Sequence, residues 1–151
     1  MNTGMMPAEV FLSHAAADAT RADEIATVLR RHGVPVWYSR TNILGAQQWH
    51  DEIGAALTRC DWFVLLLSRH SVESTWVKRE LVFALQQPRF ENRITPVLFD
   101  DCDDSRLSWT LSSFQRVDFR NSSDNGYREV LKSWGIGYRP ANELPKPPAE
   151  P

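Results

Sequence analysis

The sequence of 151 residues lacks the features that mark several large classes of protein. Its only cysteines, Cys60 and Cys102, are too few for a disulfide framework and lack the paired spacing of a zinc site. A formal net charge of -2 excludes a general attraction to DNA, RNA or acidic lipid. No apolar run approaches the roughly 20 residues of a membrane span, and no secretory leader is recognisable. We therefore expect a cytoplasmic protein without nucleic-acid or membrane partners.

With 42% hydrophobic residues, the chain can build one core of ordinary size. We predict a disordered N-terminus at residues 1–8 and one folded domain at residues 9–138. Residues 139–151 contain five prolines and no apolar periodicity, which indicates a Pro-rich tail or linker. A linker of this kind suggests a further domain or regulatory partner beyond it.

Short apolar runs alternate with helical patterns along the chain. The predicted strands are Val10–Leu12, Val34–Tyr38, Trp62–Leu67, Val97–Phe99 and Val117–Phe119. The run Trp62–Leu67 has no polar alternation, so we expect it to lie centrally in a parallel sheet, covered on both faces. Because proline cannot donate a backbone hydrogen bond, Pro96 places the start of the fourth strand near an edge or bulge. The pattern predicts an open, doubly wound, five-stranded parallel α/β sheet of the flavodoxin-like kind.

Helical spacing supplies the elements that cover this sheet. A first helix includes Ile25 and Leu29 and ends before Gly33, and a second includes Ile53 and Leu57. A third follows Ser71 and ends before Pro88, and a last one spans residues 124–134. The acidic start of the segment 100–113 indicates a solvated loop more than a metal site, because no other ligand type is spaced to complete the coordination.

Open parallel sheets bind ligands outside the carboxyl ends of their strands, where the strand order reverses. Ser13 and His14 follow the first strand, and Ser39 begins the loop that follows the second. Ser68 follows the third strand and, with His70, is more typical of a turn than of a hydrolase dyad. Scattered histidines predict no metal site, and the chain has no phosphate-binding loop or dinucleotide fingerprint.

The third helix begins at the same edge and carries Trp76 and Glu80 one turn apart. Val77, Leu81, Ala84 and Leu85 form its apolar face. Trp76 and Glu80 lie together on a shoulder roughly 110° from the centre of that face. Such a pair is common as a packing aromatic beside a surface carboxylate. Its place at the strand-end rim also lets an aromatic ring and a carboxylate contact one bound molecule.

Four features in this order resemble the Toll/interleukin receptor (TIR) domain, prokaryotic NAD-consuming type. They are Phe11-Leu12-Ser13, the strand ending in Trp37-Tyr38, the apolar strand Trp62–Leu67, and Trp76 with Glu80. The resemblance covers roughly residues 9–135 and departs at His14, where the family often has an aromatic or another polar residue. It implies that Glu80 is the catalytic residue of an NAD glycohydrolase or ADP-ribosyl cyclase in a defence or signalling pathway.

The same resemblance implies a substrate site and partners. NAD is the substrate, with no cofactor and no metal. We expect Trp76, Ser13, His14, Ser39, Gly45 and Trp49 to bind it, and the loop from Arg40 to Gln47 to close over it, with Gly45 as a flexible point. Self-association through TIR–TIR contacts is expected to activate the enzyme. The alternative is a non-catalytic TIR scaffold that mediates signalling assembly.

The chemistry of NAD explains why one carboxylate is enough. Nicotinamide leaves as a neutral base from a cationic pyridinium, so no general acid is required. The ribose gains oxocarbenium character, which a nearby carboxylate stabilises. Water capture then gives ADP-ribose, and attack from within the molecule gives a cyclic isomer. The residues do not distinguish the two products.

Overall fold

The computed structural model describes residues 6–38 and 46–141, and of residues 46–49 it describes the backbone alone. Five strands form one sheet in the order β2-β1-β3-β4-β5, and every neighbouring pair is parallel. The strands are β1 (Val10–Ser13), β2 (Val36–Tyr38), β3 (Trp62–Leu67), β4 (Ile94–Leu98) and β5 (Val117–Asp118). This order confirms the predicted doubly wound, flavodoxin-like fold.

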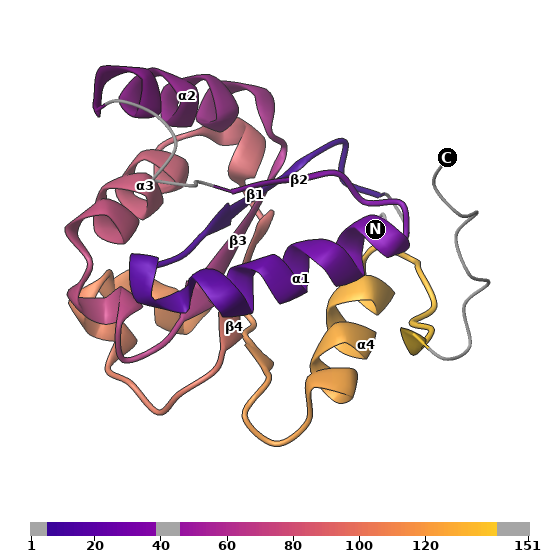
Figure 1. Cartoon of the computed structure of the whole chain (residues 1–151). Coiled ribbons are helices and arrows are strands. Elements are labelled where there is room, and N and C mark those ends of the chain that lie inside the picture. Colours follow the sequence, from indigo (N-terminus) through magenta and orange to yellow (C-terminus); the bar gives the residue numbers. More distant parts are fainter. Residues whose placement is uncertain (1–5, 39–45, 142–151) are drawn as a thin grey trace.

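In the part of the chain that the structure describes, four α-helices cover the two faces of the sheet (Figure 1). They are α1 (Ala19–Arg31), α2 (Ala46–Arg59), α3 (Thr75–Leu85) and α4 (Ser123–Ser133). Helices α1 and α4 pack on one face, and α2 and α3 on the other. Short 3₁₀ helices complete the connections: η1 (Ala16–Asp18), η2 (Ser71–Glu73), η3 (Pro88–Phe90), η4 (Asp104–Arg106) and η5 (Trp109–Ser113).

Strand β3 supplies side chains to both core layers, which confirms its predicted central place. Val64 and Leu66 join the core under α1 and α4. Phe63, Leu65 and Leu67 join the core under α2 and α3. Because successive side chains of a strand point to opposite faces, an uninterrupted apolar run is what a sheet covered on both sides requires.

Pro96 is tolerated because β5 is short. Strand β4 begins at Ile94, three residues earlier than predicted, and Pro96 lies opposite Leu65 of β3. The backbone nitrogen of Phe99 donates to Leu67 at the end of β3, whereas the carbonyl of Leu98 accepts from Phe119, which follows β5. Backbone groups of successive residues in a strand alternate in direction, so those of Leu98 and Pro96 point toward the β5 side. The pairing with β5 covers only Val97 and Leu98. The missing N–H of Pro96 therefore falls where β4 is an edge strand, as the sequence predicted.

Two glycines meet steric requirements of the layer that α1 and α4 form. Gly33 ends α1 with a φ of 85°, a left-handed conformation that favours glycine. A Cβ added to Gly126 of α4 would lie 2.7 Å from the ring of Phe119, so a larger residue there would displace that ring. The predicted stop at Gly33 is thereby confirmed.

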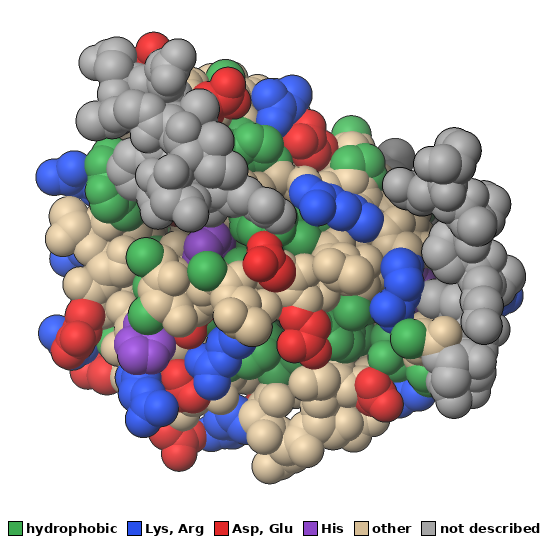
Figure 2. Space-filling view, viewed as in Figure 1, with side chains coloured by type: hydrophobic (Ala, Val, Ile, Leu, Met, Phe, Trp, Pro, Cys, Tyr) green, Lys and Arg blue, Asp and Glu red, His purple; other side chains and the backbone are tan. Residues whose placement is uncertain are grey.

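Three aspartates of the acidic segment after β4 pair with arginines. Asp100 forms two hydrogen bonds with Arg21, Asp101 pairs with Arg120, and Asp104 pairs with Arg116. Acidic and basic side chains are interspersed over the face shown in Figure 2. Within the described ranges, no helix combines the length and the apolar character that crossing a bilayer requires.

Candidate functional site

The carboxyl ends of β1 and β3 lie side by side at the point where the strand order reverses. Ser13 is the last residue of β1, and Ser68 directly follows β3. Both are buried, with exposed fractions of 1% and 0%. In a doubly wound sheet this is the position where ligands bind, because the connections leave for opposite faces on either side of it.

Helix α3 brings a carboxylate to this point from the face that α2 and α3 cover. Ser74 caps the helix by accepting a hydrogen bond from the nitrogen of Val77. Val77, Leu81 and Ala84 are buried against the sheet. Glu80 is only 6% exposed, deeper than the shoulder position that the helical arithmetic predicted. The sequence placed Glu80 correctly at the carboxyl edge and underestimated its burial.

Among the residues that the structure describes, the hydroxyl of Ser13 holds Glu80. The Ser13 Oγ donates to Glu80 Oε1 over 2.7 Å, joining α3 to the end of β1. Burial raises the pKa of Glu80 to about 7, and the hydrogen bond from Ser13 opposes that rise. Among the side chains that the structure describes, no basic group forms an ion pair with Glu80. The result is a carboxyl group that changes charge near neutral pH.

Trp76 lies one turn before Glu80 and is half-buried. The guanidinium of Arg79 lies over its ring, 5.4 Å from the centroid. The ring of His50 on α2 approaches it at a centroid distance of 6.2 Å and an angle of 60°. Trp76 thus joins α2 and α3 at the same end of the molecule that holds Glu80.

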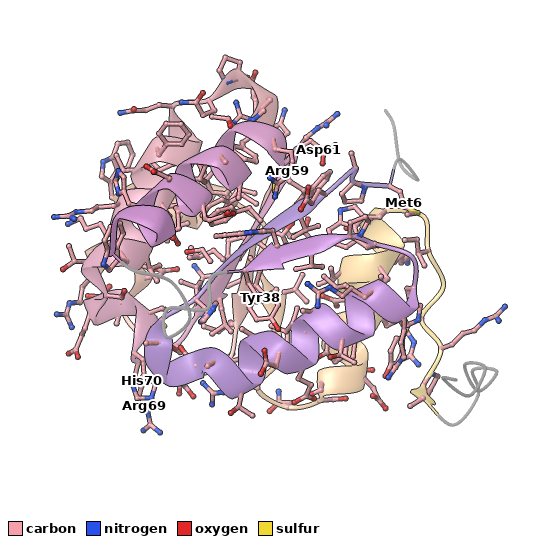
Figure 3. The ribbon with its side chains drawn as sticks, turned by 45° about the horizontal axis from the view of Figure 1, so that its top comes forward. Met6, Tyr38, Arg59, Asp61, Arg69 and His70 are labelled. Carbon is pink, nitrogen blue, oxygen red and sulfur yellow. The ribbon has the colours of Figure 1, made fainter. Side chains whose placement is uncertain are left out.

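His14 directly follows β1, and its ring bonds the backbone of the next residue. Its Nδ1 donates to the carbonyl of Ala15 over 2.8 Å, and its ring lies 6.0 Å from that of Tyr38. Tyr38 in turn donates to Asp23 of α1. Figure 3 labels Tyr38 near the middle of the molecule, between β2 and α1. The structure therefore places His14 at the predicted edge, beside the aromatic end of β2.

The other predicted site residues lie outside what the structure describes. These are Ser39, Gly45 and the side chain of Trp49, whose backbone belongs to α2. Most of the loop expected from Arg40 to Gln47 also falls there. The predicted end of this loop was wrong, because Ala46 and Gln47 already belong to α2.

The sequence reasoning missed a second buried carboxylate at this edge, Asp18. It is 2% exposed and accepts a 2.5 Å hydrogen bond from the hydroxyl of Ser68. Arg21 lies 3.3 Å from Asp18 and also binds Asp100. The sequence shows only that an aspartate lies five residues after the strand end at Ser13. Its burial depends on Ser68, which is 50 residues away in the sequence, so no local pattern could reveal it.

Ser68 forms the turn that the sequence predicted. Its Oγ accepts hydrogen bonds from the backbone nitrogens of His70 and Ser71. The ring of His70 is not needed for this turn, and Figure 3 shows His70 and Arg69 projecting outward beside the start of α1. The Ser68–His70 pair is thus a structural turn at the end of β3.

Surface hollows lie over several elements, and one of them lies on the outer face of α3 itself. Four of them, of about 460 to 610 Å³, are lined by residues other than Glu80 and Trp76. Within the described ranges, histidine, cysteine, aspartate and glutamate side chains form no group of three suited to a metal ion. The candidate site rests on geometry: the buried Glu80–Ser13 pair, with Trp76 one turn away on α3 and the ring of His50 beside Trp76.

Comparison with solved structures identifies domains of the same fold. The TIR domain of the Toll-related receptor TRR-2 from Hydra magnipapillata superposes with a TM-score of 0.67 at 14% identity, covering 83% of this chain and 97% of that one. The TIR domains of the activated Roq1 resistosome, which recognises the pathogen effector XopQ, give a TM-score of 0.53 at 21% identity, with coverages of 84% and 79%. At such identities the likeness shows the fold alone.

Comparison with sequences supplies the family. A search of curated proteins found no significant match. The family model for the TIR domain matches residues 10–131, which is most of the chain and includes both Ser13 and Glu80. The chain therefore belongs to the TIR-domain family.

Proposed function

We propose that this TIR domain cleaves the nicotinamide–ribose bond of NAD, with Glu80 as the catalytic carboxylate. The observation that carries the proposal is the buried Glu80 carboxyl group, held 2.7 Å from the Ser13 hydroxyl where the strand order reverses. The resemblance of Trp76 and Glu80 to the corresponding pair of NAD-cleaving family members supports it. NAD enters as a substrate, and the chain's own side chains supply the chemistry.

The reaction needs a negative charge near the ribose. As the bond between ribose C1′ and the pyridinium nitrogen breaks, its electron pair stays with nicotinamide, and positive charge develops on the ribose. The ionised Glu80 carboxylate, shielded from water, stabilises that charge more effectively than it would in solvent. Water then adds to C1′ and loses a proton to give ADP-ribose, or a nucleophile of the same molecule adds and gives a cyclic product.

Burial without a counter-charge suits Glu80 to a cationic substrate. In the free protein its pKa of about 7 leaves the group partly protonated at neutral pH. A pyridinium cation placed beside it favours the ionised form and lowers that pKa. The substrate thus supplies the charge partner that the described side chains do not. Trp76 offers an aromatic face to the same cation, an interaction stronger than with a neutral ring.

The test compares Glu80→Gln with the unchanged protein and with Glu91→Gln. Glu91 is an exposed carboxylate between η3 and β4 and serves as the matched control. Concentrated protein is incubated with NAD, and nicotinamide, ADP-ribose and cyclic products are resolved by chromatography. We expect Glu80→Gln to release nicotinamide about 100-fold more slowly and Glu91→Gln to match the unchanged protein. Full activity in Glu80→Gln would disprove the assignment.

A second proposal is that copies of the domain associate, as a scaffold or to activate catalysis in a defence or signalling pathway. The Roq1 resistosome is an assembly that contains TIR domains, and this supports the idea. The specific observation in this chain is the exposure of Val82 and Trp109, at 42% and 81%. Specific activity is expected to rise with protein concentration. If assembled protein releases no nicotinamide, the scaffold role alone remains.

A further inference from the structure

Three large hydrophobic side chains are exposed in the described part of the chain. They are Met6, Val82 and Trp109, with exposed fractions of 44%, 42% and 81%. Trp109 is the most unusual, because leaving an indole in water forfeits the burial of roughly 150–250 Å². Its base is rigid: Leu107 and Leu111, two residues to either side, are buried in the core under α2 and α3. An exposed indole whose neighbouring residues are anchored in the core has the properties of an anchor for a partner.

Val82 belongs to a hollow on the outer face of α3. We call this the α3 hollow; it measures about 490 Å³ and is lined by Thr75, Lys78, Arg79, Val82, Phe83 and Gln86. Most of these residues are three or four positions apart, so they share the helix side away from the buried Val77 and Leu81. The helix is therefore apolar on the side that packs on the sheet, and Val82 and Phe83 add apolar surface at the hollow.

We propose that Trp109 of one copy of this chain inserts into the α3 hollow of a second copy. The contact specifies a surface for the self-association proposed above and rests on it. It pairs two of the three exposed large side chains of the described residues, each of which lacks an apolar partner in its own copy's core. Because Trp109 and the hollow are different patches, the contact is heterologous and can add further copies in a row.

Charge also favours this pairing. Lys78 and Arg79 border the hollow, and a cation beside an indole face is attractive. Asp101 and Asp103 are exposed just before η4, which packs against η5, the element that contains Trp109. Asp101 shares the single cation of Arg120 with Asp118, and Asp103 is bonded by the neutral hydroxyl of Ser105, so this side keeps negative charge. Arg106 in this region already pairs with Glu73, at 3.6 Å. An acidic side beside Trp109 and a basic border around the hollow attract each other, so the association should weaken as salt is added.

The test removes each half of the contact separately. Trp109→Ala lacks the indole and keeps the hollow, whereas Val82→Glu keeps the indole and places a charge in the hollow. Met6→Ala is the matched control, because Met6 is exposed to the same degree as Val82. Sedimentation velocity over a concentration series measures association. We expect the unchanged protein and Met6→Ala to associate alike, and each of the other two variants to associate at least about tenfold more weakly.

Mixing the two variants decides the question. One copy of Trp109→Ala and one of Val82→Glu still form a single intact contact, so an equimolar mixture should yield a heterodimer that neither variant forms alone. A mixture that stays monomeric, or a Trp109→Ala variant that associates like the unchanged protein, would overturn the proposal, provided that circular dichroism shows both variants folded. Glu80→Gln is expected to associate normally, so a failure here is distinct from a failure of the catalytic assignment.

Discussion

Two carboxylates are buried at the carboxyl edge of the sheet, one toward each face. Asp18, on the side of α1, is 2% exposed and is bonded by the hydroxyl of Ser68 and by Arg21. Glu80, on α3, is 6% exposed and is bonded by the hydroxyl of Ser13. The difference is the counter-charge. A buried acid paired with a cation fits a structural role, whereas one held by a neutral hydroxyl is available to a cationic ligand.

The largest effect that separates the two acids is on catalysis. Changing each to its amide, Glu80→Gln and Asp18→Asn, removes one charge and little volume. Glu80→Gln should lower kcat for nicotinamide release by about 100-fold, because the charge opposite the developing oxocarbenium is lost. Asp18→Asn should lower it less than about tenfold in protein that remains folded. A comparable loss of kcat in both variants would show that the counter-charge does not distinguish their roles.

The next effect is on stability, and it is expected at high pH but not at low pH. Since the pKa of Glu80 rises from 4.5 to about 7 on folding, the folded state keeps its proton longer than the unfolded chain. Stability is therefore undiminished below pH 4.5 and falls as pH rises to about 7, by at most about 3 kcal/mol. Glu80→Gln removes this penalty. Its thermal midpoint should exceed that of the unchanged protein by several degrees at pH 8.

At pH 4.5 the same two proteins should melt together, because neither carries a charge at position 80. A variant that is less stable than the unchanged protein at pH 8 would contradict the burial of an uncompensated charge. This trade between stability and activity is expected where a fold holds a functional group in an unfavourable environment.

Asp18→Asn should lower the free energy of unfolding by somewhat less than the ionisation of Glu80 does. The substitution weakens a charge-assisted hydrogen bond from the buried Ser68 hydroxyl and removes one of the two carboxylates that pair with Arg21, leaving Asp100. We expect the free energy of unfolding to fall by about 2 kcal/mol near neutral pH, measured by urea denaturation. A stability equal to that of the unchanged protein would mean that the Asp18 network contributes nothing net.

Much of the fold follows from local patterns in the sequence. The strand Trp62–Leu67 and the end of α1 at Gly33 were predictable because an apolar run and a left-handed glycine are local signals. The 3₁₀ helices η4 and η5 were predicted only as a loop. They begin at the side-chain caps of Asp103 and Ser108 and are too short to show a periodicity.

The candidate site was predictable in its residues and less so in its environment. Trp76 and Glu80 were found because they lie one turn apart on a helix that begins at the carboxyl edge. The burial of Glu80 depends on the hydroxyl of Ser13, 67 residues earlier, and that of Asp18 on Ser68. Periodicity reports which side of a helix faces the core, but it does not report how closely another strand's end approaches that side.

The smallest predicted effect tests the hydroxyl that holds Glu80. The hydrogen bond from Ser13 favours the ionised carboxylate, so Ser13→Ala should raise the pKa of Glu80 further above its ordinary value. If catalysis uses the ionised form, kcat/KM rises with pH, and the acid limb of that profile should move upward by about 0.5 to 1 pH unit in Ser13→Ala. Ser13→Thr keeps a hydroxyl and should restore the profile where the added methyl group is accommodated. Ser13 is then a positioning residue acting through Glu80, whereas a uniform drop in rate with an unmoved acid limb would assign it a purely structural role.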